Sequence, residues 1–286
     1  MRDSLLGKAL NDLRAQVLGW GVGLGLLLAM TVALYPSISN LYGDMMKQLP
    51  EAMLAFFGSM ADFSTAEGYL NTEFFSYGML ALAVFSIMAG TAALAGEEGD
   101  GTLEVLLAQP VSRTRLLLVK VVALIAATAG IIVITFPFIW VSSLLAHVTL
   151  SWGRLLVAFV LLWLFELLVA LLAMTASLAL GGRKGGGVVV AFALVASYIV
   201  DSLANLVSGL GHVRPLLLTT YYQGNSVLAE GVNWWYIGGL GGLLAATVVA
   251  ALVLFQRKDV GVRMAWLPDG WMRWWHRGAK GSSGLA

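Results

Sequence analysis

The sequence predicts an all-α integral membrane protein with six transmembrane helices, and three observations support this class. The 286 residues are 59% hydrophobic and only 12% charged, whereas soluble domains are about 45–50% apolar and about 25% charged. Six apolar stretches are each long enough to cross a bilayer as a helix, which takes about 20 residues. Lys and Arg gather on one side of the predicted spans, as the positive-inside rule requires.

The six predicted spans follow one another along the whole chain and carry few charges. Only Glu166 and Asp201 are charged within them. No internal repeat and no separate soluble segment interrupts this order, so the sequence predicts one membrane domain over residues 1–286. The spans are placed at residues 17–35, 74–95, 121–146, 155–180, 188–210 and 236–255.

The segments outside the spans have patterns of their own. Residues 1–16 are predicted to form an interfacial helix, because their apolar residues fall on one face and their charged residues elsewhere. The tail, residues 256–286, places Trp among Arg and is predicted to lie on the membrane surface. Two larger outer loops are predicted at residues 36–73 and 211–235, and the aromatic residues of the second, Tyr222 among them, suit the outer interface.

The distribution of Lys and Arg predicts the orientation. An even number of spans places both termini on one side, which holds all but three of the 17 basic residues; the exceptions are Lys47, Arg154 and Arg214. Both termini are therefore predicted to be cytoplasmic. The alternative, a first span cleaved as a signal peptide, is disfavoured because its apolar run is too long and no small-x-small site precedes Tyr35.

The sequence contains no recognisable catalytic or metal-binding motif. It has no cysteine, and His147, His212 and His276 are widely separated. Residues 181–187 are glycine-rich and basic, but they lack the spacing of a phosphate-binding P-loop. A net charge of +1 gives no basic face for nucleic acid. The chain alone is therefore predicted to be neither an enzyme nor a metal- or cofactor-binding protein.

Residues 97–120, EEGDGTLEVLLAQPVSRTRLLLVK, form a charged segment between two long apolar stretches. Thr102 can cap a short helix over residues 103–109, and Pro110 ends that helix because proline lacks the N–H group. Ser112 can cap the helix that follows. Leucines with a rim of acidic residues suit a helix that binds a partner. The alternative is a helix lying on the membrane, which acidic residues disfavour at an anionic leaflet.

The pattern E-E-x-x-G-T-L-E-x-L-L-x-x-P-V-S-R-x-R-L-L-x-x-K in this segment resembles the signature of the type-2 ABC transporter permease family. The resemblance covers almost the whole chain, because it includes an N-terminal helix, a large first outer loop and six spans. It also includes FQRKDV at residues 255–260, where the family often has two arginines in place of Arg257 and Lys258.

This resemblance implies the membrane subunit of an ATP-driven exporter in a prokaryotic-type cell (inner) membrane. Such subunits pair as homodimers or heterodimers and bind separate ATPase subunits, which hold ATP and Mg. It also implies that part of residues 211–235 folds back into the outer leaflet, and that the charged segment is a coupling helix seated on the ATPase. The residues predicted to make that contact are Glu97, Glu98, Gly101, Thr102, Leu103, Glu104, Leu106, Leu107, Pro110, Arg113 and Arg115.

Polar residues within the spans are the candidates for a substrate path. Glu166 lies near the centre of the fourth span, where a charged side chain costs about 2.5–3.5 kcal/mol, so it is expected to face the interior in a protonated or hydrogen-bonded form. Ser197, Asp201 and Asn205 recur on one face of the fifth span. These groups either line a substrate path or make structural bonds between helices.

Small-residue motifs predict places where helices approach closely. Packing within one subunit is favoured over a contact between subunits at these motifs. They are Gly19-x-x-x-Gly23, Gly21-x-x-x-Gly25 and Gly238-x-x-x-Gly242.

The favoured function is export of a hydrophobic or amphipathic substrate, such as a drug or an antimicrobial peptide. Export of a lipid or a polysaccharide is the alternative. An ion-coupled transporter that uses Glu166 and Asp201 is less favoured, because it needs no cytoplasmic docking helix. The sequence does not identify the cargo.

Overall fold

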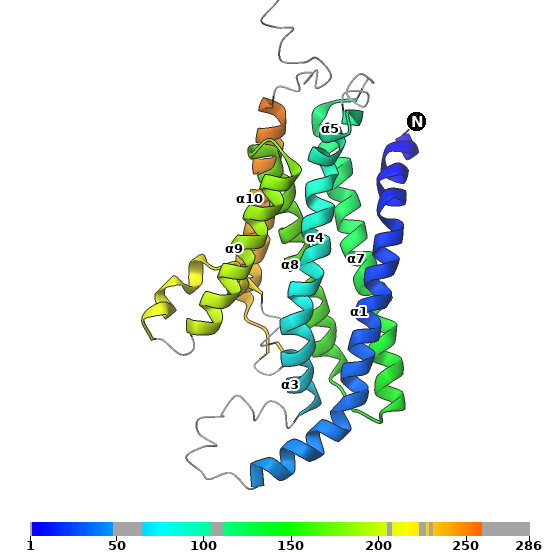
Figure 1. Cartoon of the computed structure of the whole chain (residues 1–286), viewed down its shortest axis with the longest axis vertical. Helices are drawn as coiled ribbons and strands as arrows, with labels where there is room; N and C mark the ends of the chain where they lie inside the picture. The colour runs from blue at the N-terminus through cyan, green and yellow to red at the C-terminus, as the bar shows by residue number, and fades with distance from the viewer. Residues whose placement is uncertain are drawn as a thin grey trace, which may run out of the picture.

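The computed structural model of the chain describes residues 2–47, 65–103, 111–204, 208–222, 227–228 and 231–258. Within these ranges the regular structure is helical and there is no strand. Six helices are long and apolar enough to span a membrane, and they run side by side along the longest axis (Figure 1). The predicted all-α class is confirmed. The six helices cover Leu5–Leu41, Ala66–Gly99, Arg113–Leu145, Trp152–Ala179, Arg183–Ala204 and Trp234–Arg257.

Helix α1 (Arg2–Lys47) is longer at both ends than the predicted first span. Residues 2–16 are helical as predicted, but they continue into the span without a break. The helix also continues through Pro36, where a loop was predicted, and Figure 1 shows it bending in its last part. Proline removes one helical hydrogen bond and bends a helix without necessarily ending it. The Ser39 hydroxyl donates to the Pro36 carbonyl at 3.1 Å, which supports the turn.

The second membrane-spanning helix begins earlier than predicted, so the predicted outer loop over residues 36–73 is too long. It is continuous from α3 (Ala66–Leu70) through α4 (Tyr77–Thr91) to α5 (Glu97–Gly99). Thr65 caps its start, because the Thr65 hydroxyl accepts a hydrogen bond from the Gly68 N–H at 3.0 Å. Two wider π-helical turns interrupt the α-helix, η2 (Asn71–Ser76) and η3 (Ala92–Gly96). The remainder of that loop, residues 48–64, lies outside the described residues.

Helix α8 (Trp152–Ala179) forms the centre of the bundle and packs against α4, α7, α9 and α10. Its approach to α4 is close at Gly90, since a Cβ atom there would lie 2.1 Å from the Ala170 carbonyl oxygen. Nearer the start of both helices, the aromatic rings of Phe75 and Phe159 meet edge to face, with their centroids 5.3 Å apart. Glycine and interlocking rings therefore set the distance between the two most buried helices.

Helix α7 (Arg113–Leu145) packs along α1. A Cβ atom on Gly21 would lie 2.8 Å from Ile134, and one on Gly25 would lie 2.4 Å from Phe138. Gly21-x-x-x-Gly25 therefore serves packing within one subunit, as predicted. The other two motifs differ, because a Cβ atom would meet nothing within 4 Å at any of their glycines, Gly19, Gly23, Gly238 and Gly242.

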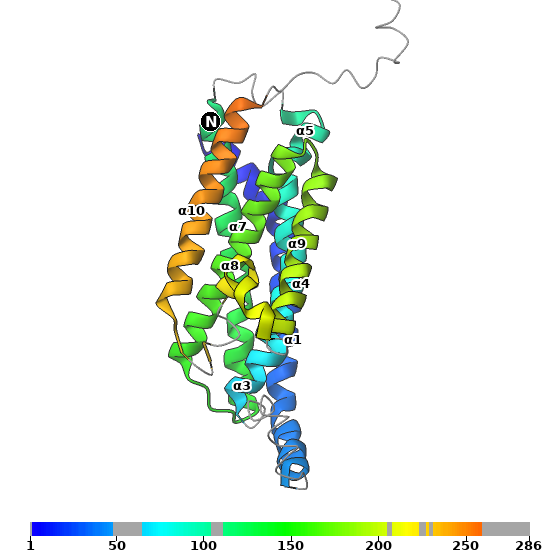
Figure 2. The same cartoon turned by 90° about the vertical axis from the view of Figure 1, so that its left-hand side faces the viewer.

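The chain folds back between α9 (Arg183–Ala204) and α10 (Trp234–Arg257). The returning segment contains the short helices η4 (Ser208–Leu216) and η5 (Thr219–Tyr221), which pack on α9 (Figure 2). The prediction that Tyr222 lies at the outer interface is wrong. Its hydroxyl donates to the Phe75 carbonyl at 3.1 Å and its ring lies 5.0 Å from that of Phe165, inside the bundle.

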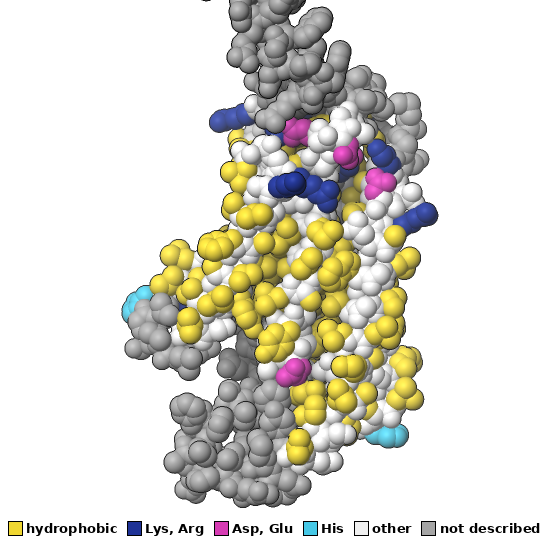
Figure 3. Space-filling view, in the orientation of Figure 1, with side chains coloured by type: hydrophobic (Ala, Val, Ile, Leu, Met, Phe, Trp, Pro, Cys, Tyr) yellow, Lys and Arg dark blue, Asp and Glu magenta, His cyan; other side chains and the backbone are white. Residues whose placement is uncertain are grey.

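The surface shows a broad apolar belt with charges at one end. In Figure 3 Lys, Arg, Asp and Glu side chains gather at the end of the bundle where α5 lies, above a belt of hydrophobic side chains. Such a belt suits the hydrocarbon core of a bilayer, and the charged end suits the headgroup region and the adjoining water.

Candidate functional site

The first candidate site lies at the charged end, where α5, the start of α7 and the end of α10 meet. Ser112 caps α7 as predicted, because its hydroxyl oxygen accepts a hydrogen bond from the Arg115 N–H at 3.3 Å. The cap fixes where α7 begins. It thereby places Arg113 in the first turn, beside the last turn of α10.

A buried ion pair joins α5 to α7. The Lys120 ammonium donates to Glu97 Oε1 at 2.6 Å. The Glu97 side chain is 12% exposed and the Lys120 side chain is 10% exposed. At this degree of burial each charge depends on the other, because losing either partner leaves an uncompensated charge.

Arg113 joins α7 to α10. Its guanidinium donates to the backbone carbonyls of Phe255 at 3.3 Å, of Gln256 at 3.4 Å, and of Lys258. The last carbonyls of a helix lack partners within it and carry its negative dipole end, so a cation there stabilises the terminus. The Gln256 amide also donates to the Thr114 hydroxyl at 3.2 Å.

A second ion pair closes the arrangement, because the Lys258 ammonium donates to the Glu98 carboxylate. The five charged residues Glu97, Glu98, Arg113, Lys120 and Lys258 are named here the charge clamp. The clamp ties the end of the second span to the beginning of the third and to the end of the last. The clamp therefore joins three membrane-spanning helices at one end of the bundle.

The structure separates the predicted coupling residues into three kinds. Glu97, Glu98 and Arg113 bond within the chain, and Leu103 is 1% exposed and belongs to the core. Gly101, Thr102 and Arg115 are exposed. At Gly101 φ is +69°, a conformation that favours glycine. The remaining predicted residues, Glu104, Leu106, Leu107 and Pro110, lie outside the described residues.

Sequence reasoning gave Lys120 and Lys258 no role. Lys120 was visible as the last residue of the matched pattern. Its spacing, three residues after Leu117 and four before Leu124, places it on a face of α7 that the structure shows to be buried. Lys258 pairs across 160 residues of sequence, and no local pattern reports such a contact.

Glu166 lies where α8 faces α4. It is fully buried, and the Ser86 hydroxyl donates to its Oε2 at 2.7 Å. Among the described residues no group bonds to its Oε1. Both expected features, an inward orientation and a hydrogen bond, are therefore present. The bond links the two most buried helices.

The polar face of α9 bonds to the segment that folds back. The Ser197 and Thr219 hydroxyls are 3.0 Å apart, and the Thr219 N–H donates to the Ser197 hydroxyl at 3.1 Å. Further along, the Asp201 carboxylate lies 3.3 Å from the Arg214 guanidinium. Ser197 and Asp201 thus hold a neighbouring segment in place. Asn205 lies outside the described residues.

Comparison with known families agrees with this architecture. The family described as ABC-2 family transporter protein matches residues 4–260. The chain belongs to this ABC-2 family. A comparison with curated proteins found no match. The ABC-2 subunit is thus the multi-pass membrane subunit of an ABC transporter, of a kind generally not catalytic itself, and its family implies an ABC ATPase as partner.

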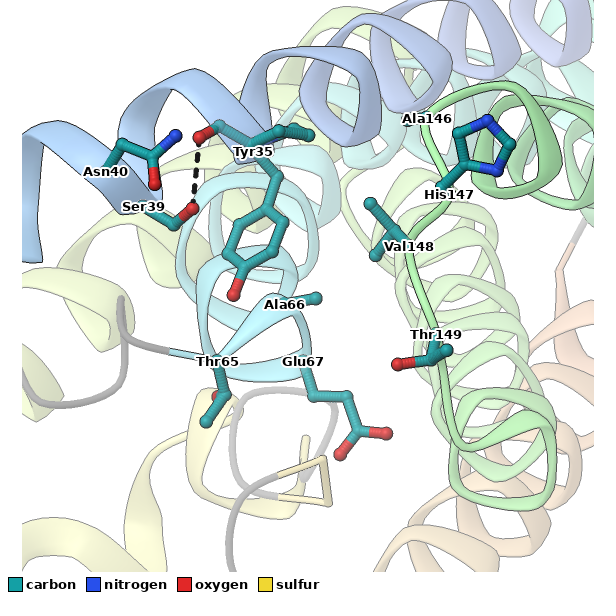
Figure 4. Close-up of a pocket in the computed structure, with 11 residues that line it drawn as sticks. Tyr35, Ser39, Asn40, Thr65, Ala66, Glu67, Ala146, His147, Val148 and Thr149 are labelled. Carbon is teal, nitrogen blue, oxygen red and sulfur yellow. Dashed lines mark hydrogen bonds between the residues drawn. The ribbon is translucent and has the colours of Figure 1, made fainter.

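The opposite end of the ABC-2 subunit carries a polar cavity of about 480 Å³ (Figure 4). Tyr35, Glu67 and Thr149 line it from α1, α3 and the connection after α7. The Glu67 carboxylate is already engaged, because it accepts from the Ser151 N–H at 2.6 Å and lies 3.8 Å from Arg154. None of the predicted site residues that the structure describes lines this cavity. In the described part of the chain no three His, Asp or Glu side chains form a metal site.

Proposed function

We propose that the chain is the transmembrane subunit of an ATP-driven exporter, which moves a hydrophobic or amphipathic substrate out of the cytoplasm or the inner leaflet. A separate ATPase holds ATP and Mg and supplies the energy. The observation that carries the proposal is the charge clamp at the end of the loop between the second and third spans. A loop that served only as a connection would not need ties to both α7 and α10.

The clamp suggests how a movement of the ATPase reaches the membrane. When two ATPases close on ATP, each displaces the loop docked on it. Because Glu97 and Glu98 are paired with Lys120 and Lys258, α5 moves together with α7 and α10. Helix α8 packs against both and passes the displacement to the centre of the bundle. Rigid helices joined by paired charges transmit such a displacement better than a loose loop.

Two features of the surface support the proposed setting. Lys and Arg of the described residues concentrate at the clamp end, which favours a cytoplasmic position for this end and for both termini. The open glycines Gly238 and Gly242 on α10 leave a face free for a second subunit, so a dimer of two such chains, identical or different, fits the proposal.

The docking prediction is tested with Leu106→Glu and Leu107→Glu together. We expect the ATPase to be lost from the purified complex, because two charges replace leucines that the sequence predicts to face the ATPase. The unfolding temperature of the chain itself is expected to stay within a few degrees.

Leu103→Glu is the contrasting variant, because Leu103 is buried in the core and its replacement is expected to lower the stability of the chain itself. If the complex of Leu106→Glu with Leu107→Glu survives purification with normal ATP turnover, the docking assignment is wrong.

The role of Glu166 in a substrate path is tested with Glu166→Gln. The amide keeps the size and can still accept from Ser86, so folding is expected to be unchanged. Transport in vesicles is expected to fall about tenfold, which corresponds to about 1.4 kcal/mol. Asp201→Asn is the companion variant, since its partner Arg214 lies on the segment that folds back. Unchanged transport in both variants would leave these residues a structural role only.

A further inference from the structure

Two adjoining cavities lie along α1, between it and α4. The first is an apolar groove of about 440 Å³, lined by Gly19, Trp20, Gly23, Leu24, Leu27 and Ala81. The second is a pocket of about 270 Å³ nearer the N-terminal end of α1. Gln16 lines both. A molecule that occupied both would have its polar part at the charged end of the bundle and its apolar part at the depth of the hydrocarbon.

The open glycines of α1 create the apolar groove. At Gly19 and Gly23 an added Cβ atom would meet nothing within 4 Å, so no part of the described chain fills this space. Trp20 and Leu27 border it. The alternating glycines Gly21 and Gly25 face α7 and are packed, so the two glycine faces of α1 have different roles.

The pocket carries charges of both signs. Three carboxylates line it, Asp12, Glu97 and Asp100, with two cations, Lys120 and Arg183, so its net charge is −3 + 2 = −1. Lys120 is already engaged by Glu97 Oε1. The other oxygen, Glu97 Oε2, is buried and has no hydrogen-bond partner among the described residues. An acceptor left in this state costs free energy unless a donor reaches it.

Part of the pocket wall is made of small side chains. Ala92, Ala93 and Gly96 of η3 face Ala9 of α1, and Ala123 of α7 closes the set. The π-helical turn η3 therefore lies directly at the pocket. Turns of this kind are frequent at functional sites. The space suits a compact headgroup.

We propose that this cleft binds a phospholipid with a primary ammonium headgroup. The ammonium lies among the carboxylates of Asp12, Glu97 and Asp100, the phosphate lies toward Arg183, and one acyl chain follows the groove past Gly23. Three carboxylates disfavour an anionic headgroup, and an ammonium supplies the donors that the unpaired oxygen of Glu97 needs. On the orientation proposed above, the lipid belongs to the cytoplasmic leaflet.

The test uses the purified full-length chain and does not require the ATPase, so its outcome is independent of the proposed export function. Phosphatidylethanolamine and phosphatidylglycerol of equal chain length are titrated, and bound lipid is counted by native mass spectrometry. We expect phosphatidylethanolamine to bind about tenfold more tightly, the difference that one charged hydrogen bond makes. Asp12→Asn with Asp100→Asn is expected to remove most of this preference.

Gly23→Leu fills the groove and is expected to abolish binding of both lipids. The matched control, Gly153→Leu on α8, adds the same side chain at another open glycine and is expected to leave binding unchanged. Equal binding of the two lipids would overturn the headgroup assignment. Unchanged lipid binding in Gly23→Leu would contradict the assignment of the groove to an acyl chain. If that variant also lost a dimer, the groove would instead be a contact with a second copy of the chain.

Discussion

Replacing Lys120 by Met is expected to lower the free energy of unfolding by about 3–5 kcal/mol, the cost of leaving one buried charge without its partner. Glu97 would remain with its carboxylate 12% exposed and no cation beside it. The same change is expected to release α5 from α7 and to reduce ATP-driven transport. Unfolding in mixed detergent micelles and transport in vesicles measure the two effects separately.

Two controls decide whether the effect comes from the ion pair. The double variant Glu97→Gln with Lys120→Met removes both charges and is expected to recover most of the stability. Glu67→Gln removes the charge of the more exposed contact with Arg154 at the other end, keeps an acceptor for the Ser151 N–H, and is expected to cost less than about 1 kcal/mol. A Lys120→Met chain as stable as the starting protein would contradict the charge clamp.

Replacing Gly90 by Ala is expected to cost about 3 kcal/mol, at the upper end of the usual cost of overpacking. The new Cβ atom would lie 2.1 Å from the Ala170 carbonyl oxygen, and backbone atoms cannot move aside as a flexible side chain can. The two helices would separate, and this also strains the bond between Ser86 and Glu166. The measurement is again the free energy of unfolding in mixed micelles.

Gly78→Ala is the matched control for this prediction. Gly78 lies on the same helix and is also buried, but its added Cβ atom would meet only the Phe74 ring, at 3.7 Å. That distance is ordinary van der Waals contact. Because alanine has the higher helix propensity, Gly78→Ala is expected to leave the stability unchanged or to raise it slightly. Equal stability losses in the two variants would contradict a close approach of α4 to α8 that is specific to Gly90.

The membrane fold could be predicted because hydropathy reports the free energy of placing each segment in a bilayer. The ends of the helices could not be predicted in the same way, since they are set by local hydrogen bonds. Helix α1 passes through Pro36, and the second span begins near Thr65 because a side-chain cap satisfies its first turn. Tyr222 was assigned to the interface because its ring is amphipathic, but its hydroxyl finds a buried carbonyl instead.

The candidate site could be predicted in part. The pattern over residues 97–120 located the segment, and Ser112 caps α7 as predicted. No cap is seen at Thr102, because Thr102 is itself helical and its hydroxyl donates to the Glu97 carbonyl at 3.2 Å. The pairing of Glu98 with Lys258 could not be predicted, because it depends on how α10 packs at the end of the bundle. Leu103 was counted with the docking residues because leucines at helical spacing look alike in sequence, whether they face a partner or the core.

The central claim is that an ATPase docks on the loop that follows α5. The sequence contains no cysteine, so single cysteines can be introduced without background. Thr102→Cys places a thiol at an exposed position beside the clamp, and Thr149→Cys places one at an exposed position after the far end of α7. The measurement is cross-linking of each variant to the ATPase in membranes, with and without ATP. We expect a cross-link from Thr102→Cys that ATP changes and none from Thr149→Cys; a cross-link from Thr149→Cys alone would contradict the proposed docking and orientation.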